Sequence, residues 1–308
     1  MKCRRFASVL PLSILSIIMT LLLPACAGNS GGGAGESHRL RYGMRSGDVL
    51  DYRSERAVEQ ILHTQGGDQV QRGSETAAYA IACRRKGRDI GLRTSLEEMT
   101  AELELPQSRL IPDLEGIRGQ VFTLKVDRQG GESVLGGQDR LLYELTPGIY
   151  RSAASSFQAF FPDLPRRPLK VGDRWSSRER LDDSDSRYEV TVHLVTDYEL
   201  LAYESCEGNS CARIGIAFAG LLLGEGEDGD LLLRFHASLS GAGEFVFDLG
   251  RGLMLSLSNE GMGEGLIAGS GSQVFEIPFT RTISSKTRLE NSSMASDQPA
   301  KGFPRPCP

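Results

Sequence analysis

Most of the chain alternates between apolar and polar residues with a period of two, which predicts β-strands that turn one face toward a core. Tyr188, Val190, Val192 and Leu194 share one phase, and charged or polar residues share the other. The same alternation recurs over residues 214–218, 231–239 and 253–257. Gly, Asp, Asn and Pro separate these segments, as they do in turns between antiparallel strands. The pattern therefore predicts an antiparallel β-sheet as the bulk of the molecule.

One predicted strand changes phase along its length. From Ile90 to Leu96 the apolar side chains occupy even positions, and from Met99 to Leu105 they occupy odd positions. An extra residue on one strand shifts the alternation by one position. We therefore expect a β-bulge near Glu97-Glu98.

Residues 147–161 have helical spacing instead. Thr146 supplies a capping hydroxyl, Pro147 suits the first helical position and Pro162 ends the segment. Apolar residues recur three and four positions apart, at Ile149, Tyr150, Ala153, Ala154, Phe157, Phe160 and Phe161. Residues 138–145 are expected to add a short preceding helix. The predicted fold class is mainly β (α+β): a curved antiparallel sheet or half-barrel with one amphipathic helix packed in its concavity.

The first 26 residues have a different character. Lys2, Arg4 and Arg5 precede the apolar run Phe6–Leu23, which ends at Leu23-Pro24-Ala25-Cys26. These are the parts of a secretory signal. The junction resembles the bacterial lipoprotein lipobox, in which Leu23 and Ala25 match the pattern and Pro24 departs from it. The resemblance implies lipidation of Cys26 and removal of residues 1–25. An uncleaved anchor is the alternative, because about 18 apolar residues can just span a bilayer.

The remaining chain divides by composition. We expect a lipidated cysteine with a Gly-rich tether, one β-rich domain and a disordered tail, at residues 26–38, 39–290 and 291–308. The domain is expected to contain two β meanders joined by the helical segment, at residues 39–137, 168–290 and 138–165. A Gly-Asp turn, at Gly47-Asp48 and at Gly172-Asp173, opens each meander.

Charge restricts the partners. The formal net charge is −5, and loss of Lys2, Arg4 and Arg5 with the signal makes it −8. That charge argues against binding to nucleic acid. The expected partners are a membrane, through the lipid anchor, and a lipid or an envelope protein.

Four cysteines remain besides Cys3 and Cys26. Cys206 and Cys211 flank the turn-forming residues 207–210, so a disulfide would staple a hairpin. Free thiols and a metal pair are the alternatives, although a CxxxxC spacing alone is a weak metal signal. The pairing of Cys83 and Cys307 stays open.

No sequence motif predicts catalysis. The chain lacks HExxH and GxSxG, and its GxGxxG at Gly224–Gly229 lies between two apolar strand patterns and is acidic. We therefore predict no catalytic residue, no metal site and no cofactor.

Residues 161–175, FPDLPRRPLKVGDRW, resemble a segment of the DUF6263 family of uncharacterised bacterial proteins. The ending Phe245–Leu289 is similar as well, with a strand, a D-x-G-x-G turn and a returning strand. The resemblance implies a β-rich fold over most of residues 40–290 and supplies no catalytic residue. A curved sheet with a helix in its concavity also resembles, in architecture, the LolA, LolB and LppX-type carriers of lipids and lipoproteins.

These observations predict a non-enzymatic envelope lipoprotein that serves as a structural or interaction module. The alternative is a carrier of a lipid or other apolar ligand, whose cavity Tyr150, Phe157, Phe160 and Phe161 would line. Ala27 stands where an Asp would retain many enterobacterial lipoproteins at the inner membrane, which favours the outer membrane.

Overall fold

The computed structural model describes residues 37–87, 89–146, 149–184, 188–271 and 274–295. The main element is a 12-stranded antiparallel sheet with several strands of 16–20 residues. Its strands are β1 (Val49–Thr64), β2 (Gly67–Lys86), β3 (Asp89–Leu105), β4 (Ser108–Leu110), β5 (Val121–Val126), β6 (Glu132–Gly136), β9 (Arg174–Ser184), β10 (Tyr188–Cys206), β11 (Asn209–Asp228), β12 (Leu231–Asp248), β13 (Leu253–Gly271) and β14 (Phe275–Ser293).

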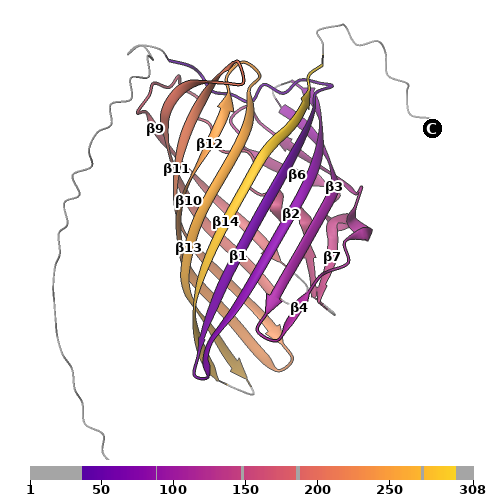
Figure 1. The fold of residues 1–308 in the computed structure, drawn as a ribbon, viewed down its shortest axis with the longest axis vertical. Coiled ribbons are helices and arrows are strands. Elements are labelled where there is room, and N and C mark those ends of the chain that lie inside the picture. Colours follow the sequence, from indigo (N-terminus) through magenta and orange to yellow (C-terminus); the bar gives the residue numbers. More distant parts are fainter. Residues whose placement is uncertain (1–36, 88, 147–148, 185–187, 272–273, 296–308) are drawn as a thin grey trace, which may run out of the picture. The chain divides into compact units, whose positions relative to one another are not determined.

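The strand order is β6-β5-β3-β2-β1-β14-β13-β12-β11-β10-β9, with β4 paired to β3 (Figure 1). Most neighbours are hairpins of consecutive strands, the simplest connection for antiparallel pairing. Two pairs are exceptions: β3 pairs with β5 beyond the short β4, and β1 pairs with β14. The second pair joins the two halves of the chain from Val49↔Ser293 to Leu62↔Phe279. β7 (Leu142–Thr146) and β8 (Ile149–Ser152) form a separate two-stranded hairpin.

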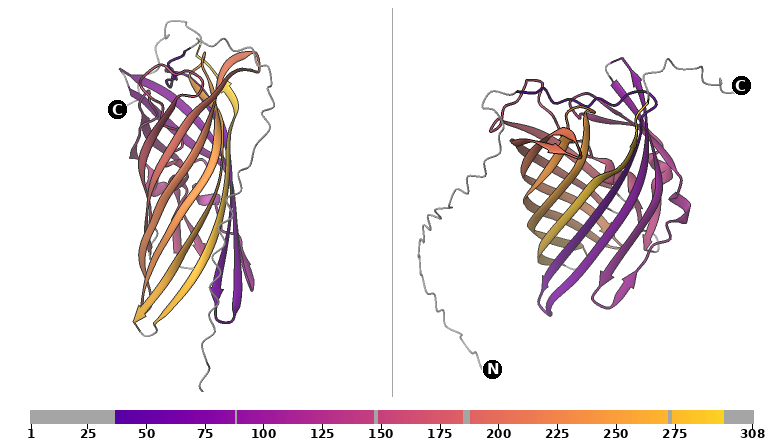
Figure 2. Two further views of the ribbon diagram at one scale, coloured as in Figure 1. Left: turned by 90° about the vertical axis from the view of Figure 1, so that its left-hand side faces the viewer. Right: turned by 45° about the horizontal axis from the view of Figure 1, so that its top comes forward.

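The sheet is twisted and curled, so that β10–β12 pass behind β1 and β2 (Figures 1 and 2). The connection between β8 and β9 contacts both outermost strands. The Gln158 side-chain amide donates to the Asp182 carbonyl of β9 at 2.5 Å and accepts from its backbone N–H at 2.9 Å. Three residues later, the Phe161 N–H donates to the Glu132 carboxylate of β6 at 2.7 Å. This connection therefore forms a seam between the two edges of the sheet.

The buried core occupies one end of the sheet. It contains residues from the starts of β1, β3, β11 and β13 and from the ends of β2, β10, β12 and β14. Its largest fully buried side chains include Tyr42, Tyr52, Phe122, Phe245 and Phe247. Two buried tyrosines satisfy their hydroxyls on backbone carbonyls, Tyr52 on Met254 at 2.7 Å and Tyr42 on Pro162 at 3.0 Å. Burial removes these hydroxyls from water, so they need such acceptors.

The predicted amphipathic helix over residues 147–161 is wrong, and with it the α+β fold class. No α-helix occurs among the described residues, and the only helical turns are short 3₁₀ segments at Glu115–Ile117, Gln138–Leu141 and Ala153–Phe157. Residues 138–145 likewise form a 3₁₀ turn followed by β7.

The segment avoids an α-helix for local reasons. Pro147-Gly148, a dipeptide whose composition also favours a turn, comes between β7 and β8 in the chain and lies outside the described residues. Serine hydroxyls compete with helical hydrogen bonds, and Ser152 Oγ accepts the Ala154 N–H at 3.2 Å. Ala159 has a φ of 56°, in the left-handed region. A continuous right-handed helix through Phe161 is therefore excluded.

One prediction of local structure is confirmed. The bulge expected near Glu97-Glu98 is confirmed, because Ala78 pairs with Glu98 and Tyr79 with Leu96, leaving Glu97 as the extra residue. Ordered structure also occurs at both margins of the domain expected over residues 39–290. His38 forms a β-bridge with Leu169, and β14 continues to Ser293. Cys26, the signal segment and Cys307 lie outside the described residues. No helix within the described residues is long and apolar enough to span a membrane.

Candidate ligand-binding face

Beyond the core, the inward side of β10–β14 is apolar but only half-buried. We call these side chains the distal face: Val190, Val192, Leu194, Phe218, Leu222, Leu231, Leu233, Phe235, Leu239, Ile267, Phe275, Ile277 and Ile283. They share the strand phase of the core residues Phe245 and Ile214, as the cross-strand pairs Phe245↔Ile214 and Ala237↔Leu222 show. Each keeps part of its surface accessible to solvent. Apolar side chains that face inward without being fully covered are the usual lining of a ligand site.

The outward side of the same strands is mostly polar. On β12 the outward positions include Arg234, His236 and Ser238, and on β14 they include Lys286 and Arg288. Exposed leucines occur there too, and Leu221 is 55% exposed. Over β10–β14 the sheet thus separates an apolar inward side from a more polar outward side.

Glycines on β13 flatten the distal face. A Cβ at Gly261 would meet Phe218 Cζ at 2.8 Å, and one at Gly265 would meet Phe279 Cζ at 2.8 Å. The missing side chains let these two rings lie across the neighbouring backbone. The distal face is therefore a broad and even apolar surface.

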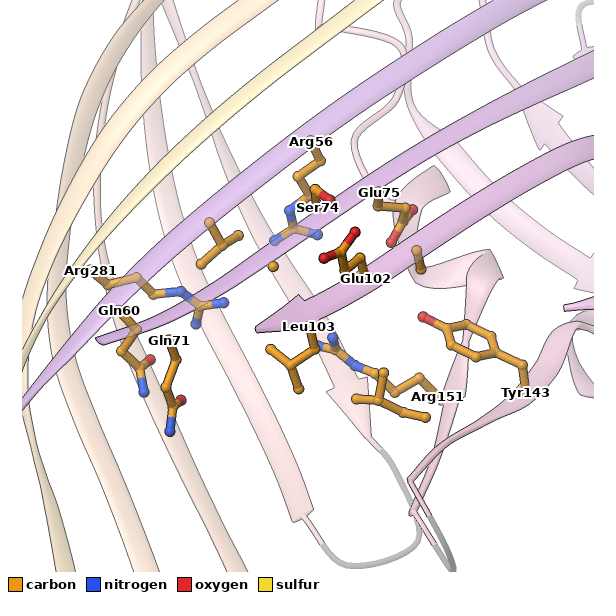
Figure 3. Close-up of a pocket in the computed structure, with 14 residues that line it drawn as sticks. Arg56, Gln60, Gln71, Ser74, Glu75, Glu102, Leu103, Tyr143, Arg151 and Arg281 are labelled. Carbon is orange, nitrogen blue, oxygen red and sulfur yellow. The ribbon is translucent and has the colours of Figure 1, made fainter. Parts of the chain in front are cut away.

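A more polar cavity of about 150 Å³ adjoins this face. It lies on the inward side of β1–β3 beneath the β7–β8 hairpin (Figure 3). Arg56, Arg281 and Arg151 line it together with Glu75 and Glu102. Tyr143, Leu145, Val58 and Leu103 supply apolar walls. The combination of apolar walls and a few charged groups is typical of a binding site for an amphipathic molecule.

The seam carries a cluster of carboxylates. The pKa of Glu132 is raised from 4.5 to about 8, mainly because burial disfavours the carboxylate. The hydrogen bond from the Phe161 N–H opposes this rise, and the charges of Glu179 and Asp163 contribute to it. Burial also raises the pKa values of Asp163 and Glu179. No set of three metal-ligating side chains with suitable geometry occurs among the described residues. The raised pKa values of these three acids make the charge of the seam depend on pH.

The aromatic residues predicted to line a ligand cavity lie elsewhere. Phe157, Phe160 and Phe161 are only 2%, 5% and 2% exposed. Phe157 contacts Tyr79 edge-on at 4.4 Å and stacks on Phe160 at 4.4 Å, and Phe160 contacts Tyr52 at 5.3 Å between ring centroids. They fill the core between the seam and β1–β2. Tyr150 is 45% exposed on β8. The structure does not bring these four residues together around an open space.

Cys206 and Cys211 flank the tight turn Glu207-Gly208, whose residues both have positive φ. Their Cα atoms are 6.0 Å apart, and a disulfide joins the two side chains in the structure. That separation lies in the usual range for disulfides. Oxidation of this pair in an oxidising compartment stays a prediction, and Cys83 is buried as a free thiol.

The arginine-lined cavity was not predicted, although the sequence carries a signal for it. Arg281 falls on the apolar phase of β14, between Phe279 and Ile283, and Arg56 falls on the inward phase of β1, between Tyr52 and Val58. A charged side chain on the inward phase of a strand is costly unless it is paired or solvated. Such a position is therefore a marker for a site.

Comparisons with known proteins identify no family. No family model matches the chain, and no curated protein matches it. The solved structures it resembles include OccAB2 of Acinetobacter baumannii at 7% identity and a TM-score of 0.20, which covers 79% of this chain and 98% of that chain. OccK2 (OpdF) of Pseudomonas aeruginosa has 8% identity and a TM-score of 0.22, covering 79% and 98%. A BenF-like porin from Pseudomonas fluorescens Pf-5 has 7% identity and a TM-score of 0.18, covering 78% and 98%. At these TM-scores the likeness carries no argument about fold or function.

Proposed function

We propose that this chain is a non-enzymatic lipoprotein of the bacterial cell envelope that binds an apolar ligand on its distal face. The observation that supports the binding role is the half-buried apolar side chains that face inward on five adjacent strands, from Val190 of β10 to Ile283 of β14. Removing such a surface from water is favourable by about 25 cal/mol per Å² of apolar area. A ligand with an apolar body would supply the missing cover.

The lipid anchor is proposed on the Leu23-Pro24-Ala25-Cys26 junction alone. Cys26→Ser should leave an unprocessed precursor and abolish labelling with a radioactive fatty acid. Normal processing and labelling of this variant would contradict the anchor without affecting the binding proposal.

The binding role is tested by native purification from an envelope fraction. Solvent extraction would release non-covalent lipids and leave any acyl chains on Cys26 attached to the protein. Mass spectrometry of the extract should find an apolar molecule in a stable ratio to the protein. The proposal is wrong if nothing co-purifies and the extracted protein also fails to bind a neutral fluorescent apolar probe.

A protein-interaction module is the second candidate. Val195, Leu221 and Met262 are 42%, 55% and 57% exposed on the outward side of β10, β11 and β13. Exposed apolar residues grouped on one surface are typical of protein–protein contacts. Crosslinking in the envelope that depends on Leu221, with no bound lipid, would favour this role.

A further inference from the structure

We infer that the cavity beneath the β7–β8 hairpin receives the acidic head group, a carboxylate or phosphate, of an amphiphile whose apolar chain lies on the distal face. This inference rests on the proposed function and specifies its ligand class. It is carried by three arginines that line one cavity at the border of an apolar surface.

The three arginines come from three different strands and converge on one cavity. Arg56 comes from β1 and Arg281 from β14, both on the inward phase of their strands. Arg151 comes from β8, on the hairpin that covers the cavity. Figure 3 shows the three guanidinium groups extending toward the same space. Guanidinium groups bind carboxylates and phosphates through two parallel hydrogen bonds, so this arrangement fits an oxyanion.

The lining of the cavity carries charges of both signs. Glu75 and Glu102 are the carboxylates in the lining. Glu102 is paired outside it with Arg109 of β4, whose Nη2 donates to Glu102 Oε2 at 2.5 Å. The lining therefore contains three arginines and two carboxylates, so its formal charge is positive. An anionic group would be attracted to this part of an otherwise acidic protein.

The cavity is continuous with the distal face. Arg281 of β14 is the cross-strand partner of Gly263 on β13, and Gly263 is the partner of Leu239 on β12. Leu239 in turn is the partner of Gly220 on β11, next to Leu222. Neighbouring strands are about 4.8 Å apart, so these steps cover about 14 Å. An acyl chain that starts at Arg281 would cross the glycines of β13 and contact the apolar side chains beyond them.

The test uses the purified full chain stripped of non-covalent lipid. The probes are oleate, its uncharged twin oleyl alcohol, oleoyl lysophosphatidate and inorganic phosphate. We expect both anionic amphiphiles to bind more tightly than the alcohol. The double variant Arg56→Gln/Arg281→Gln should lower the affinity for both anionic amphiphiles by about tenfold or more, because loss of hydrogen bonds to a charged group reduces affinity by at least that factor. Binding of oleyl alcohol should change by less than about twofold.

The matched control is Arg72→Gln/Arg288→Gln. These arginines lie on the outward side of β2 and β14 and are 59% and 50% exposed. This variant changes the net charge by the same amount and should bind all probes as the parent does. If the inward double variant fails to fold, Arg151→Gln on the hairpin provides the same comparison.

The outcomes separate the two proposals. Equal binding of oleate and oleyl alcohol, unaffected by the inward arginines, would overturn the head-group inference and leave the apolar-ligand proposal standing. Binding of no amphiphile would overturn both. Binding of inorganic phosphate alone would mark a site for free anions and would also overturn the inference.

Discussion

Asp48 and Asp173 occupy the same place in two copies of one turn. Asp48 Oδ2 accepts the Arg45 N–H at 2.6 Å, and Asp173 Oδ2 accepts the Lys170 N–H at 2.8 Å. The preceding glycines, Gly47 and Gly172, have φ values of 95° and 89°. Each turn also exchanges two backbone hydrogen bonds with the neighbouring strand, through Cys83 in the first copy and Leu200 in the second. The two halves of the sheet thus begin with the same hydrogen-bonded unit.

The two aspartates differ in burial, which predicts different consequences of mutation. Asp48 is fully buried, and its Oδ1 also accepts the Ala295 N–H at 2.9 Å. Asp48→Ala would leave two backbone donors without an acceptor and should lower the free energy of unfolding by about 2–4 kcal/mol. Asp173→Ala, at a partly exposed turn, is the control and should have a much smaller effect. Urea denaturation of both variants tests this difference, and equal losses would contradict it.

The three phenylalanines of the seam, Phe157, Phe160 and Phe161, should stabilise the core and should not contact the ligand. Phe157→Ala empties a buried site and should cost about 3–5 kcal/mol of stability. Because Phe157 lies away from the distal face, the folded variant should still bind a neutral apolar probe. Phe235→Ala, on the distal face and half-buried, is the comparison. Phe235→Ala should lower the melting temperature less than Phe157→Ala does, and it should lower the affinity for the probe more. The reverse result in thermal unfolding and probe titration would place the ligand at the seam.

The glycines of β13 should resist substitution on the inward side. In Gly261→Ala the new Cβ would lie 2.8 Å from Phe218 Cζ and 3.2 Å from the Ser240 carbonyl oxygen, so the ring must move. Overpacking of this kind costs about 1–3 kcal/mol. At Gly215 the three atoms nearest to a new Cβ all belong to the flexible Leu201 side chain, the closest at 3.2 Å, so Gly215→Ala should be tolerated. Differential scanning calorimetry of the two variants would reveal the difference, and a melting temperature unchanged in both would contradict it.

Glu132 predicts a dependence of stability on pH. Its pKa is about 8 in the folded chain against an ordinary value of 4.5. Between these values the folded state binds more protons than the unfolded state, so the free energy of unfolding should fall as the pH rises from about 4.5 to 8 and then level off. The whole shift corresponds to about 5 kcal/mol. We expect about 2 kcal/mol, because the side chain keeps some exposure to solvent.

Glu132→Gln should reduce this slope, since an amide oxygen still accepts the Phe161 N–H without ionising. Glu276→Gln, on the outward side of β14, serves as the control. Denaturant unfolding at pH 5, 6, 7 and 8 measures the slope for each protein. A parent protein that gains stability over this range would show that the seam acids are stabilised as anions.

The local features of this fold could be predicted from the sequence because each depends on near neighbours. The phase change at Glu97, the Gly-Asp turns and the hairpin between Cys206 and Cys211 follow from alternation and turn chemistry. The pairing of β1 with β14 could not be predicted, since Val49 and Ser293 carry no local signal for each other.

The helix prediction failed for a related reason. The spacing of Phe157, Phe160 and Phe161 fits one face of a helix, but the structure buries the same three rings from a 3₁₀ turn and an irregular seam. Tertiary packing decided between these conformations, and local propensity is a weak guide in that situation. The arginine-lined cavity could not be predicted for both reasons. Its lining combines the paired strands β1 and β14 with the β7–β8 hairpin, and neither the pairing nor the hairpin was predicted.

The most direct test of the distal face uses two adjacent leucines on opposite sides of β11. Leu222 points inward, between Val192 and Ala237, and Leu221 points outward beside His193 and Ser238. Leu222→Asn and Leu221→Asn make the same chemical change one residue apart. Titration of the lipid-stripped protein with a neutral fluorescent apolar probe should show affinity reduced about tenfold or more for Leu222→Asn, because a polar group in an apolar contact is unfavourable. Leu221→Asn should bind as the parent does. Equal affinities for the two variants, or a loss confined to Leu221→Asn, would contradict a ligand on the distal face.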